Sequence, residues 1–240
     1  MFSYYGSKSK IVDCYPKPKY GKIIEPFAGS ARYSLKWFDR DVLLVDKYDV
    51  IIKTWHYLQR ATEKDILGLP KMEHGDSIRN YPQLSEDEKN LLSFLVCAGS
   101  SGGRMNVGSM LGIDVEGDLK RIAKNLFKIK HWEIRQASYE SIDNQEATWF
   151  IDPPYQFGGH EYKHNNKNIN YPELSEWCRE RQGKVIVCEN TKATWMEFKP
   201  IKQMQGTKFK TTEAIWSNQR TAFDNEQSNL FATVALQNVK

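Results

Sequence analysis

The sequence predicts an α/β fold built on a mainly parallel sheet that helices cover on both faces. Short apolar runs typical of strands alternate along the chain with segments in which apolar residues recur every three or four positions, as on one face of a helix. This alternation predicts parallel strands joined by crossover helices. The last two expected strands have no helix between them, so we expect them to form an antiparallel pair that closes the sheet.

The expected elements follow these patterns in order along the chain. Strands are expected at 22–27, 42–46, 132–137, 148–152, 184–188, 213–217 and 230–237. Helices are expected at 30–40, 49–62, 174–181 and 193–198. A further helix is expected after Ser85, because Ser85 and Glu88 have the spacing of a capping pair before an apolar run. We therefore predict one domain made of 1–62 and 132–240, with a mainly helical insertion at 63–131.

Composition favours a protein of the cytoplasm. The 240 residues are enough to bury one large core, and their formal net charge is +4. No apolar run approaches the ~20 residues of a membrane span, and the opening residues lack the apolar core of a signal peptide. The four cysteines form no CxxC pair and have no histidine at ligand spacing, so we expect neither a metal site nor a disulfide framework. The oligomeric state is open between a monomer and a weak dimer.

A loop of small residues follows the first expected strand. Glu25-Pro26-Phe27-Ala28-Gly29-Ser30 leads into a helical pattern, and small side chains let such a loop pass close to a bound cofactor. Asp46 ends the second expected strand, about 20 residues after the glycine turn, which is the ribose-hydroxyl position of Rossmann-like cofactor sites. With a single glycine the loop is not a phosphate cradle. S-adenosylmethionine, which carries no phosphate, does not need one.

The most informative motif is Asp152-Pro153-Pro154-Tyr155, which directly follows the apolar run 149–151. An exocyclic amine on a nucleobase is a poor nucleophile and must be held still to react. A carboxylate at a strand end can accept one N–H and a rigid Pro-Pro backbone offers a carbonyl for the second, which aims the lone pair at a methyl donor. The tyrosine ring can stack on a base swung out of the duplex. The same residues also suit a strand that ends in a Pro-rich turn, with the tyrosine as rim packing.

With the N-terminal segment Tyr4-Tyr5-Gly6-Ser7-Lys8, these motifs resemble the DNA adenine-N6 methyltransferases of the DNA adenine methylase family. The resemblance covers nearly the whole chain and includes the order of the motifs. It implies a Rossmann-like class I methyltransferase sheet with S-adenosylmethionine as cofactor, and a target-recognition role for the insertion. It also implies that the cofactor is contacted by Tyr4, Tyr5, Gly6 and Lys8.

Two further cofactor contacts are implied by the same resemblance. One is Asp152 itself, and the other is the segment of Ser138 and Tyr139, which corresponds to the family's contact with the adenine of the cofactor.

The chain departs from the family pattern at several positions. The family often has Trp at the position of Tyr4, Gly at Ser7 and Asp at Ser138.

Basic residues in the insertion are the candidates for contact with double-stranded DNA. Arg104 follows the glycine-rich stretch 99–103, and Lys120 and Arg121 belong to a basic stripe opposite the apolar stripe of a helical pattern. Such a stripe is also typical of a merely solvated helix, whereas in a DNA-binding protein it would follow phosphates. Lys163 lies in the polar loop 156–170, which we expect to be mobile and to close over the extruded base.

We therefore predict a site-specific DNA methyltransferase that acts on adenine N6 with base flipping. Asp152 and the Pro153 carbonyl would hold the amine, and Tyr155 would stack on the base. Cytosine-N4 methylation, which the same architecture performs, is one alternative, and a catalytically silent module that binds DNA or the cofactor is another. Methyltransferases for RNA adenine or protein glutamine usually carry Asn in place of Asp152. The chain contains no Pro-Cys dipeptide, which methylation of a cytosine ring carbon requires. Whether a partner nuclease exists is open.

Overall fold

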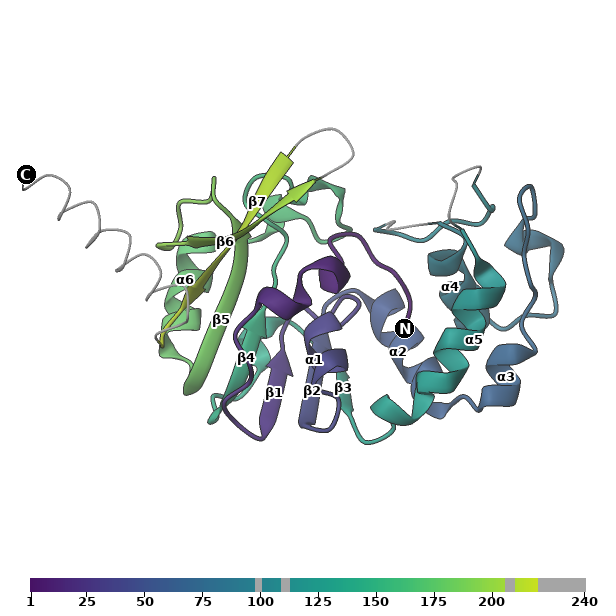
Figure 1. Ribbon diagram of the computed structural model, residues 1–240, viewed down its shortest axis with the longest axis horizontal. Coiled ribbons are helices and arrows are strands. Elements are labelled where there is room, and N and C mark those ends of the chain that lie inside the picture. The colour runs from purple at the N-terminus through teal and green to yellow at the C-terminus, as the bar shows by residue number, and fades with distance from the viewer. Residues whose placement is uncertain (98–100, 109–112, 206–209, 220–240) are drawn as a thin grey trace, which may run out of the picture.

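The computed structural model describes residues 1–97, 101–108, 113–205 and 210–219, and a seven-stranded sheet forms the centre of this part of the chain (Figure 1). The strand order is β3-β2-β1-β4-β5-β7-β6. The strands are β1 Lys22–Glu25, β2 Asp41–Asp46, β3 Glu133–Gln136, β4 Ala147–Ile151, β5 Gly183–Asn190, β6 Lys199–Gln205 and β7 Lys210–Ser217. Neighbours from β3 to β5 pair in parallel, and β7 runs antiparallel to both β5 and β6. This is the arrangement of a Rossmann-like class I methyltransferase sheet, which confirms the predicted fold class.

Burial on both faces explains why the central strands are continuous apolar runs. Successive side chains of a strand point to opposite faces. In β2, Val42 and Leu44 join one buried cluster, while Leu43 and Val45 join a second cluster on the other face. Parallel sheets are stable only when both faces are covered in this way.

Helices supply that cover. The first cluster contains side chains of α1 (Arg32–Lys36) and α2 (Asp49–Arg60), and the second contains Leu174 and Cys178 of α6 (Tyr171–Glu180). The expected helices at 30–40, 49–62 and 174–181 are thus present, although α1 is much shorter than expected. Short 3-10 turns connect the elements: η1 Lys8–Lys10, η2 Val12–Cys14, η3 Ile78–Asn80, η4 Leu126–Ile129, η5 Tyr139–Ser141, η6 Gly159–Glu161 and η7 Asn166–Asn168.

The closing antiparallel pair differs from the expectation. Its strands are β6 and β7, so the partner of the expected strand 213–217 is Lys199–Gln205. Residues 193–198, expected as a helix, have neither helix nor strand. The expected strand at 230–237 lies outside the described residues. β6 contains a proline and has little alternation of apolar and polar residues. Such a sequence suits an edge strand, which pairs on one side only, but it lacks the alternating pattern by which a strand is predicted.

The insertion is helical in its described part and packs beyond the β3 edge of the sheet (Figure 1). It contains α3 (Glu63–Leu67), α4 (Glu86–Leu95) and α5 (Val115–Asn125). The Ser85 hydroxyl and the Glu88 carboxylate form the predicted capping box at the start of α4. Buried side chains of α4 and α5 belong to the same apolar cluster as α2 and one face of the sheet. The insertion is therefore fixed to the sheet domain by a shared core.

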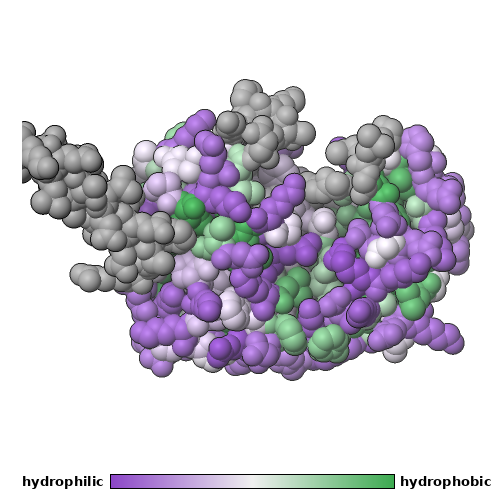
Figure 2. Space-filling model, in the orientation of Figure 1, coloured by the Kyte–Doolittle hydropathy of each residue, from purple (hydrophilic) through white to green (hydrophobic). Residues whose placement is uncertain are grey.

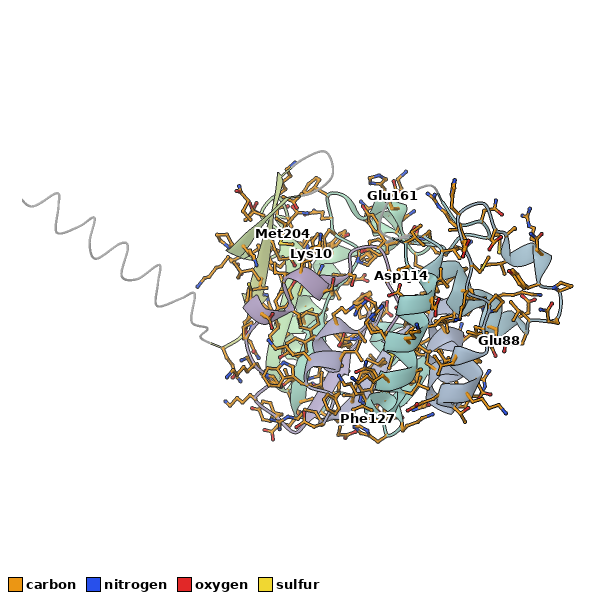
Figure 3. The ribbon with its side chains drawn as sticks, turned by 45° about the vertical axis from the view of Figure 1, so that its right-hand side comes forward. Lys10, Glu88, Asp114, Phe127, Glu161 and Met204 are labelled. Atoms are coloured by element: carbon orange, nitrogen blue, oxygen red, sulfur yellow. The ribbon has the colours of Figure 1, made fainter. Side chains whose placement is uncertain are left out.

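The surface is mostly polar. Figure 2 shows hydrophilic residues over most of the face in view, and the exposed large apolar side chains among the described residues are scattered. Phe127, the most exposed of them, lies at the opposite edge of the molecule from Glu161 in Figure 3. All four cysteines are free thiols. In the described part of the chain no helix is long and apolar enough to cross a bilayer, and no group of three or more potential metal ligands is found.

Candidate active site

A pocket opens at the carboxyl ends of β1, β2 and β4, where ligands bind in open α/β sheets. The N-terminal segment, the loop after β1, the end of β2, the segment after β3 and the motif after β4 all contribute to it. Every residue assigned to the cofactor from the sequence lines this pocket: Tyr4, Tyr5, Gly6, Lys8, Glu25, Pro26, Phe27, Ala28, Gly29, Ser30, Asp46, Ser138, Tyr139 and Asp152. Pro154 lines it as well, whereas Pro153 and Tyr155 are not among the lining residues.

The loop after β1 passes closely under the N-terminal segment. Gly29 has a φ of 44°, and a Cβ there would lie 3.2 Å from Cδ1 of Tyr4. The indole N–H of Trp55 on α2 donates to the Gly29 carbonyl at 2.9 Å. Glycine is thus needed at this turn both for its backbone conformation and for the approach of the tyrosine ring.

Asp46 is held by backbone groups. Its Oδ2 accepts the N–H of Gly29 at 3.0 Å and its Oδ1 accepts the N–H of Tyr48 at 2.9 Å. Burial raises the pKa of Asp46 to about 6, although these N–H groups oppose the shift. A carboxylate has about four lone-pair positions, so Asp46 keeps capacity to accept hydroxyl groups from a ligand in the pocket.

Glu25 has a structural partner within the wall of the pocket. Its Oε1 accepts the backbone N–H of Ser34 in α1 at 2.7 Å. Burial raises the pKa of Glu25 to about 8, so the carboxyl group is largely protonated at neutral pH. The predicted cofactor contact of Glu25 stays a prediction beside this observed role at the start of α1.

The segment after β3 supplies an aromatic wall. The ring of Tyr139 lies 5.5 Å from that of Phe27, measured between centroids, and also packs edge-on against Trp177 of α6. The hydroxyl of Ser138 donates to the Glu140 carboxylate. Ser138 thus brings a short polar side chain into the lining of the pocket.

Asp152 forms an ion pair with Lys8 at the other end of the pocket. Lys8 Nζ lies 2.9 Å from Asp152 Oδ1, and both side chains are largely buried. Burial raises the pKa of Asp152 to about 6, and the ammonium group of Lys8 opposes this rise. For Lys8, burial acts to lower the pKa, but the Asp152 and Glu213 carboxylates outweigh it and the pKa is raised. Lys8, predicted as a cofactor contact, is therefore also the counter-ion of the predicted catalytic carboxylate.

Tyr155 and Glu213 extend this ion pair behind the pocket. Lys8 Nζ donates to the Tyr155 hydroxyl at 2.7 Å, and that hydroxyl donates to Glu213 Oε1 at 2.5 Å. The Tyr15 hydroxyl donates to the same oxygen at 2.7 Å. Sequence reasoning missed Glu213, because a glutamate in a strand near the C-terminus is ordinarily a solvated residue and nothing local marks it as buried.

The proline pair is fixed by the loop that follows it. The hydroxyl of Tyr171 donates to the Pro154 carbonyl at 2.7 Å. A Cβ on Gly159 would lie 2.9 Å from the carbonyl carbon of Pro154, so the loop returns closely over the motif. Pro153 is buried, and the role of its carbonyl as acceptor for an amine stays a prediction.

The loop 156–170 contributes pocket residues that the sequence did not single out: Tyr162, His164, Asn168 and Ile169. The Tyr162 hydroxyl donates to the Tyr5 carbonyl at 3.2 Å, and a Cβ on Gly6 would lie 2.1 Å from that hydroxyl. Burial lowers the pKa of His164. The sequence predicted that this loop lies over the site. Its polar composition, however, did not indicate which of its side chains point into the pocket.

The same loop is tied to other parts of the chain by further hydrogen bonds. Glu189, at the end of β5, accepts the backbone N–H of Gln156 at 2.6 Å. The hydroxyl of Ser101 in the insertion donates to the Glu161 carbonyl, so the loop and the insertion meet beside the pocket (Figure 3).

The predicted DNA contacts differ in how they are engaged. Lys120 pairs with Glu116 at 2.8 Å, and Arg121 pairs with Asp118 and donates to the Met1 carbonyl at 2.8 Å. Arg104 and Lys163 are exposed. Lys120 and Arg121 therefore already have acidic partners, and Arg121 helps to hold the N-terminal segment.

Comparison with known proteins gives a limited result. No protein-family model and no curated protein sequence matches the chain. A conserved hypothetical protein of Streptococcus pyogenes is 10% identical over 81% of this chain and 84% of its own, with a TM-score of 0.34. The Escherichia coli protein yhhF, provisionally described as a methyltransferase, is 9% identical over 89% of this chain and 81% of its own, with a TM-score of 0.37. The Haemophilus influenzae protein HI0767, provisionally described as a methylase, is 10% identical over 83% of this chain and 87% of its own, with a TM-score of 0.37. Likeness at this level carries no conclusion about activity.

Proposed function

We propose that the chain is an S-adenosylmethionine-dependent methyltransferase that acts on adenine N6 in DNA. One observation carries the proposal. A single pocket at the carboxyl ends of the strands has the Asp46 carboxylate and the loop after β1 in one part, and the Asp152 carboxylate in another. Such a pocket can hold a cofactor beside a group that orients the acceptor amine.

The residues around Asp46 fit the cofactor. Asp46 keeps acceptor capacity for ribose hydroxyls, because the backbone N–H groups of Gly29 and Tyr48 each occupy only one lone pair of its carboxylate. Phe27, Tyr139 and Ile169 give the pocket the flat apolar walls that a heteroaromatic ring requires. When bound, S-adenosylmethionine supplies a methyl group on a positively charged sulfur atom.

The residues around Asp152 fit an amine acceptor. Lys8 occupies one lone pair of Asp152 Oδ1, which leaves other acceptor positions for an N–H of the target. An ionised carboxylate accepts that N–H more strongly than the neutral acid does, and a pKa of about 6 leaves Asp152 mostly ionised at neutral pH. An N–H held in this way directs the nitrogen lone pair away from Asp152 and toward the methyl donor.

No general base is required before methyl transfer. The nitrogen gains a positive charge as its new bond to carbon forms, and its surplus proton becomes acidic at that moment. Asp152 is then the nearest ionised carboxylate in the pocket and can take the proton, which leaves a neutral methylamino group. The proton passes to solvent when the product leaves.

The test is nucleoside analysis by mass spectrometry after DNA without methylated bases has been incubated with the full chain and S-adenosylmethionine. N6-methyladenine is the expected product. N4-methylcytosine without methylated adenine would replace adenine by cytosine as the target. If the chain binds S-adenosylmethionine by calorimetry but modifies no base, the proposed transfer to DNA is wrong.

Base flipping gives a separate prediction for DNA affinity. A duplex in which the target adenine is mismatched should bind more tightly than the matched duplex, because part of the free energy cost of flipping the base has already been met.

A further inference from the structure

The carboxylate of Glu213 is buried behind the wall of the pocket. Glu213 lies in β7, opposite Asn190 of β5 and Lys202 of β6 in the register of the sheet. Only 8% of the residue is exposed, and it does not line the pocket. Burying a charge is costly unless it is paired and hydrogen-bonded. The partners of Glu213 therefore show what the charge is used for.

Glu213 is linked to Asp152 by an unbroken chain of contacts. Its Oε1 accepts the Tyr155 hydroxyl at 2.5 Å, the Tyr155 oxygen accepts from Lys8 at 2.7 Å, and Lys8 Nζ lies 2.9 Å from Asp152. Lys8 Nζ is also 3.7 Å from Glu213 Oε1. A phenol has one proton, and donating it to Glu213 turns the oxygen lone pairs of Tyr155 toward the Lys8 ammonium group.

We propose that Glu213 is a positioning residue of the reaction, which fixes the Tyr155 hydroxyl and the Lys8 ammonium group so that both hold Asp152 in its reactive place. The inference rests on the proposed function, because it gives Glu213 a task in methyl transfer. Glu213 itself does not touch the substrate. Glu213 acts on Asp152 in two ways. It fixes the positions of Tyr155 and Lys8, and its negative charge acts directly on the pKa of Asp152.

The charges around Asp152 give this role a signature that a merely structural residue lacks. The groups that interact electrostatically with Asp152 come from several elements and loops: Lys8 from η1, Tyr15 from the segment after η2, Glu25 from β1, Tyr162 from the loop after β4, Cys188 and Glu189 from β5, Glu213 from β7, and Tyr155 from its own motif. The tyrosines and the cysteine have raised pKa values and are neutral near pH 7. Among the charged groups, the Lys8 cation and the Glu213 carboxylate act most strongly on the pKa of Asp152.

The sign of the Glu213 effect follows directly. A neighbouring negative charge makes ionisation of Asp152 harder, so Glu213 raises the pKa of Asp152, whereas Lys8 lowers it. Replacing Glu213 by Gln keeps an oxygen that can accept from both tyrosines but removes the charge. The pKa of Asp152 should then fall below about 6, and activity should persist to a lower pH than in the unchanged protein.

The experiment compares Glu213→Gln and Glu213→Ala with two controls in the full chain. Glu197→Gln removes an exposed carboxylate whose partner is Arg179, and Tyr15→Phe removes the other hydrogen bond to Glu213 without altering Tyr155. The first measurement is the carboxyl ¹³C titration of Asp152, assigned by its loss in Asp152→Asn. The second is kcat and KM for methyl transfer to unmethylated DNA across pH.

For Glu213→Ala we expect kcat to fall about 10–100-fold, the usual scale for residues that orient a reacting group through another side chain. The KM for S-adenosylmethionine should change less than about twofold, because Asp46 is untouched and lies in a different part of the pocket. For Glu213→Gln we expect a smaller fall in kcat, with the acid limb and the Asp152 titration both moved to lower pH. Glu197→Gln should move neither, and Tyr15→Phe should keep the pH profile.

Two results overturn the proposal. One is an Asp152 titration in Glu213→Gln that coincides with that of the unchanged protein. The other is a normal kcat in both Glu213 variants. If Glu213→Ala does not fold, Glu213→Gln decides alone, because it retains an acceptor of the same shape. If the unchanged protein methylates no DNA, the proposed function fails, while the Asp152 titration still decides whether Glu213 controls that carboxylate.

Discussion

The pocket contains two half-buried aspartates that are held in different ways. Asp46 is held by hydrogen bonds from backbone N–H groups, among them those of Gly29 and Tyr48. Asp152 is held by the side chain of Lys8, which is in turn bound to Tyr155 and lies near Glu213. Both carboxyl groups have a pKa of about 6, raised by burial. Burial is the main cause in both cases, but backbone N–H groups oppose it at Asp46 and the Lys8 ammonium group opposes it at Asp152.

This difference separates binding from chemistry. A carboxylate held by backbone groups keeps its position whatever side chains surround it, which suits a fixed contact with a cofactor. A carboxylate held by charged side chains can be tuned by them, and it is correspondingly vulnerable to their loss. Substitutions near Asp46 should therefore change affinity alone, whereas substitutions near Asp152 should change rate and pH dependence.

The largest effect is expected for Asp152→Ala. This change removes the acceptor that orients the amine, so methyl transfer should fall by about 10²–10⁴-fold. S-adenosylmethionine affinity, measured by calorimetry, should change little if Asp46 is the main polar anchor. Turnover close to that of the unchanged protein would remove the tetrapeptide from the mechanism.

Lys8→Met should affect both stability and pH dependence. It leaves two buried carboxylates without their cation, and losing one partner of a buried ion pair costs about 3–5 kcal/mol of unfolding free energy. Since Lys8 lowers the pKa of Asp152, its loss should raise that pKa above about 6 and move the acid limb of activity to higher pH. This shift is opposite to the one expected for Glu213→Gln.

The matched control is Lys36→Met. Lys36 pairs with Asp13 at 2.6 Å, but the aspartate side chain is 86% exposed. An exposed pair contributes about 0–1 kcal/mol, so denaturation of this variant should differ little from that of the unchanged protein. Equal losses in the Lys8 and Lys36 variants would contradict the importance of the buried cluster.

Asp46→Ala should weaken S-adenosylmethionine binding by about 1.5–3 kcal/mol, the scale of a hydrogen bond to a charged group. DNA affinity without cofactor should barely change. The backbone N–H groups of Gly29 and Tyr48 lose their acceptor as well, so Asp46→Asn, which retains one carbonyl oxygen, is the control. Unaltered cofactor affinity in calorimetry would place the ribose contact elsewhere.

The comparison also shows which parts of the site a sequence can predict. Asp46 and Asp152 both follow apolar strand runs, and the ends of parallel strands meet at one edge of the sheet. That rule predicted that these two carboxylates share one pocket, whereas the contacts from the N-terminal segment and from Ser138 and Tyr139 were implied only by the resemblance. The same rule is silent on side chains that arrive from an irregular loop, which is why Tyr162 and His164 were not identified.

The antiparallel pair of β6 and β7 was harder to predict from the sequence. Residues 193–198 contain apolar residues at helical spacing, yet they have neither helix nor strand, and the following strand β6 has a sequence without clear alternation. Edge strands pair on one side only and need less apolar patterning. The burial of Glu213 was not predicted for a different reason. Its hydrogen-bond partners Tyr15 and Tyr155 lie 198 and 58 positions away in the chain, so no local pattern indicates them.

The smallest expected effect lies outside the pocket, in the insertion. Arg104 is exposed, and its backbone N–H is fixed by the Ser93 carbonyl at 2.9 Å. Lys120, by contrast, already pairs with Glu116, which Lys71 also neutralises. If the insertion contacts DNA, Arg104→Ala should therefore weaken binding more than Lys120→Ala does. The measurement is equilibrium binding over a range of salt concentrations and target sequences.

The form of the Arg104 effect distinguishes two kinds of contact. Relaxed discrimination at one base position, worth about 1–3 kcal/mol, indicates that arginine reads a base edge. Uniform weakening with a shallower salt dependence indicates a phosphate contact. If neither variant alters binding or site preference, the insertion is not the recognition surface. The loop 156–170, which meets the insertion at Ser101 and carries the exposed Lys163, then becomes the next surface to test, because it connects the pocket to the outside of the molecule.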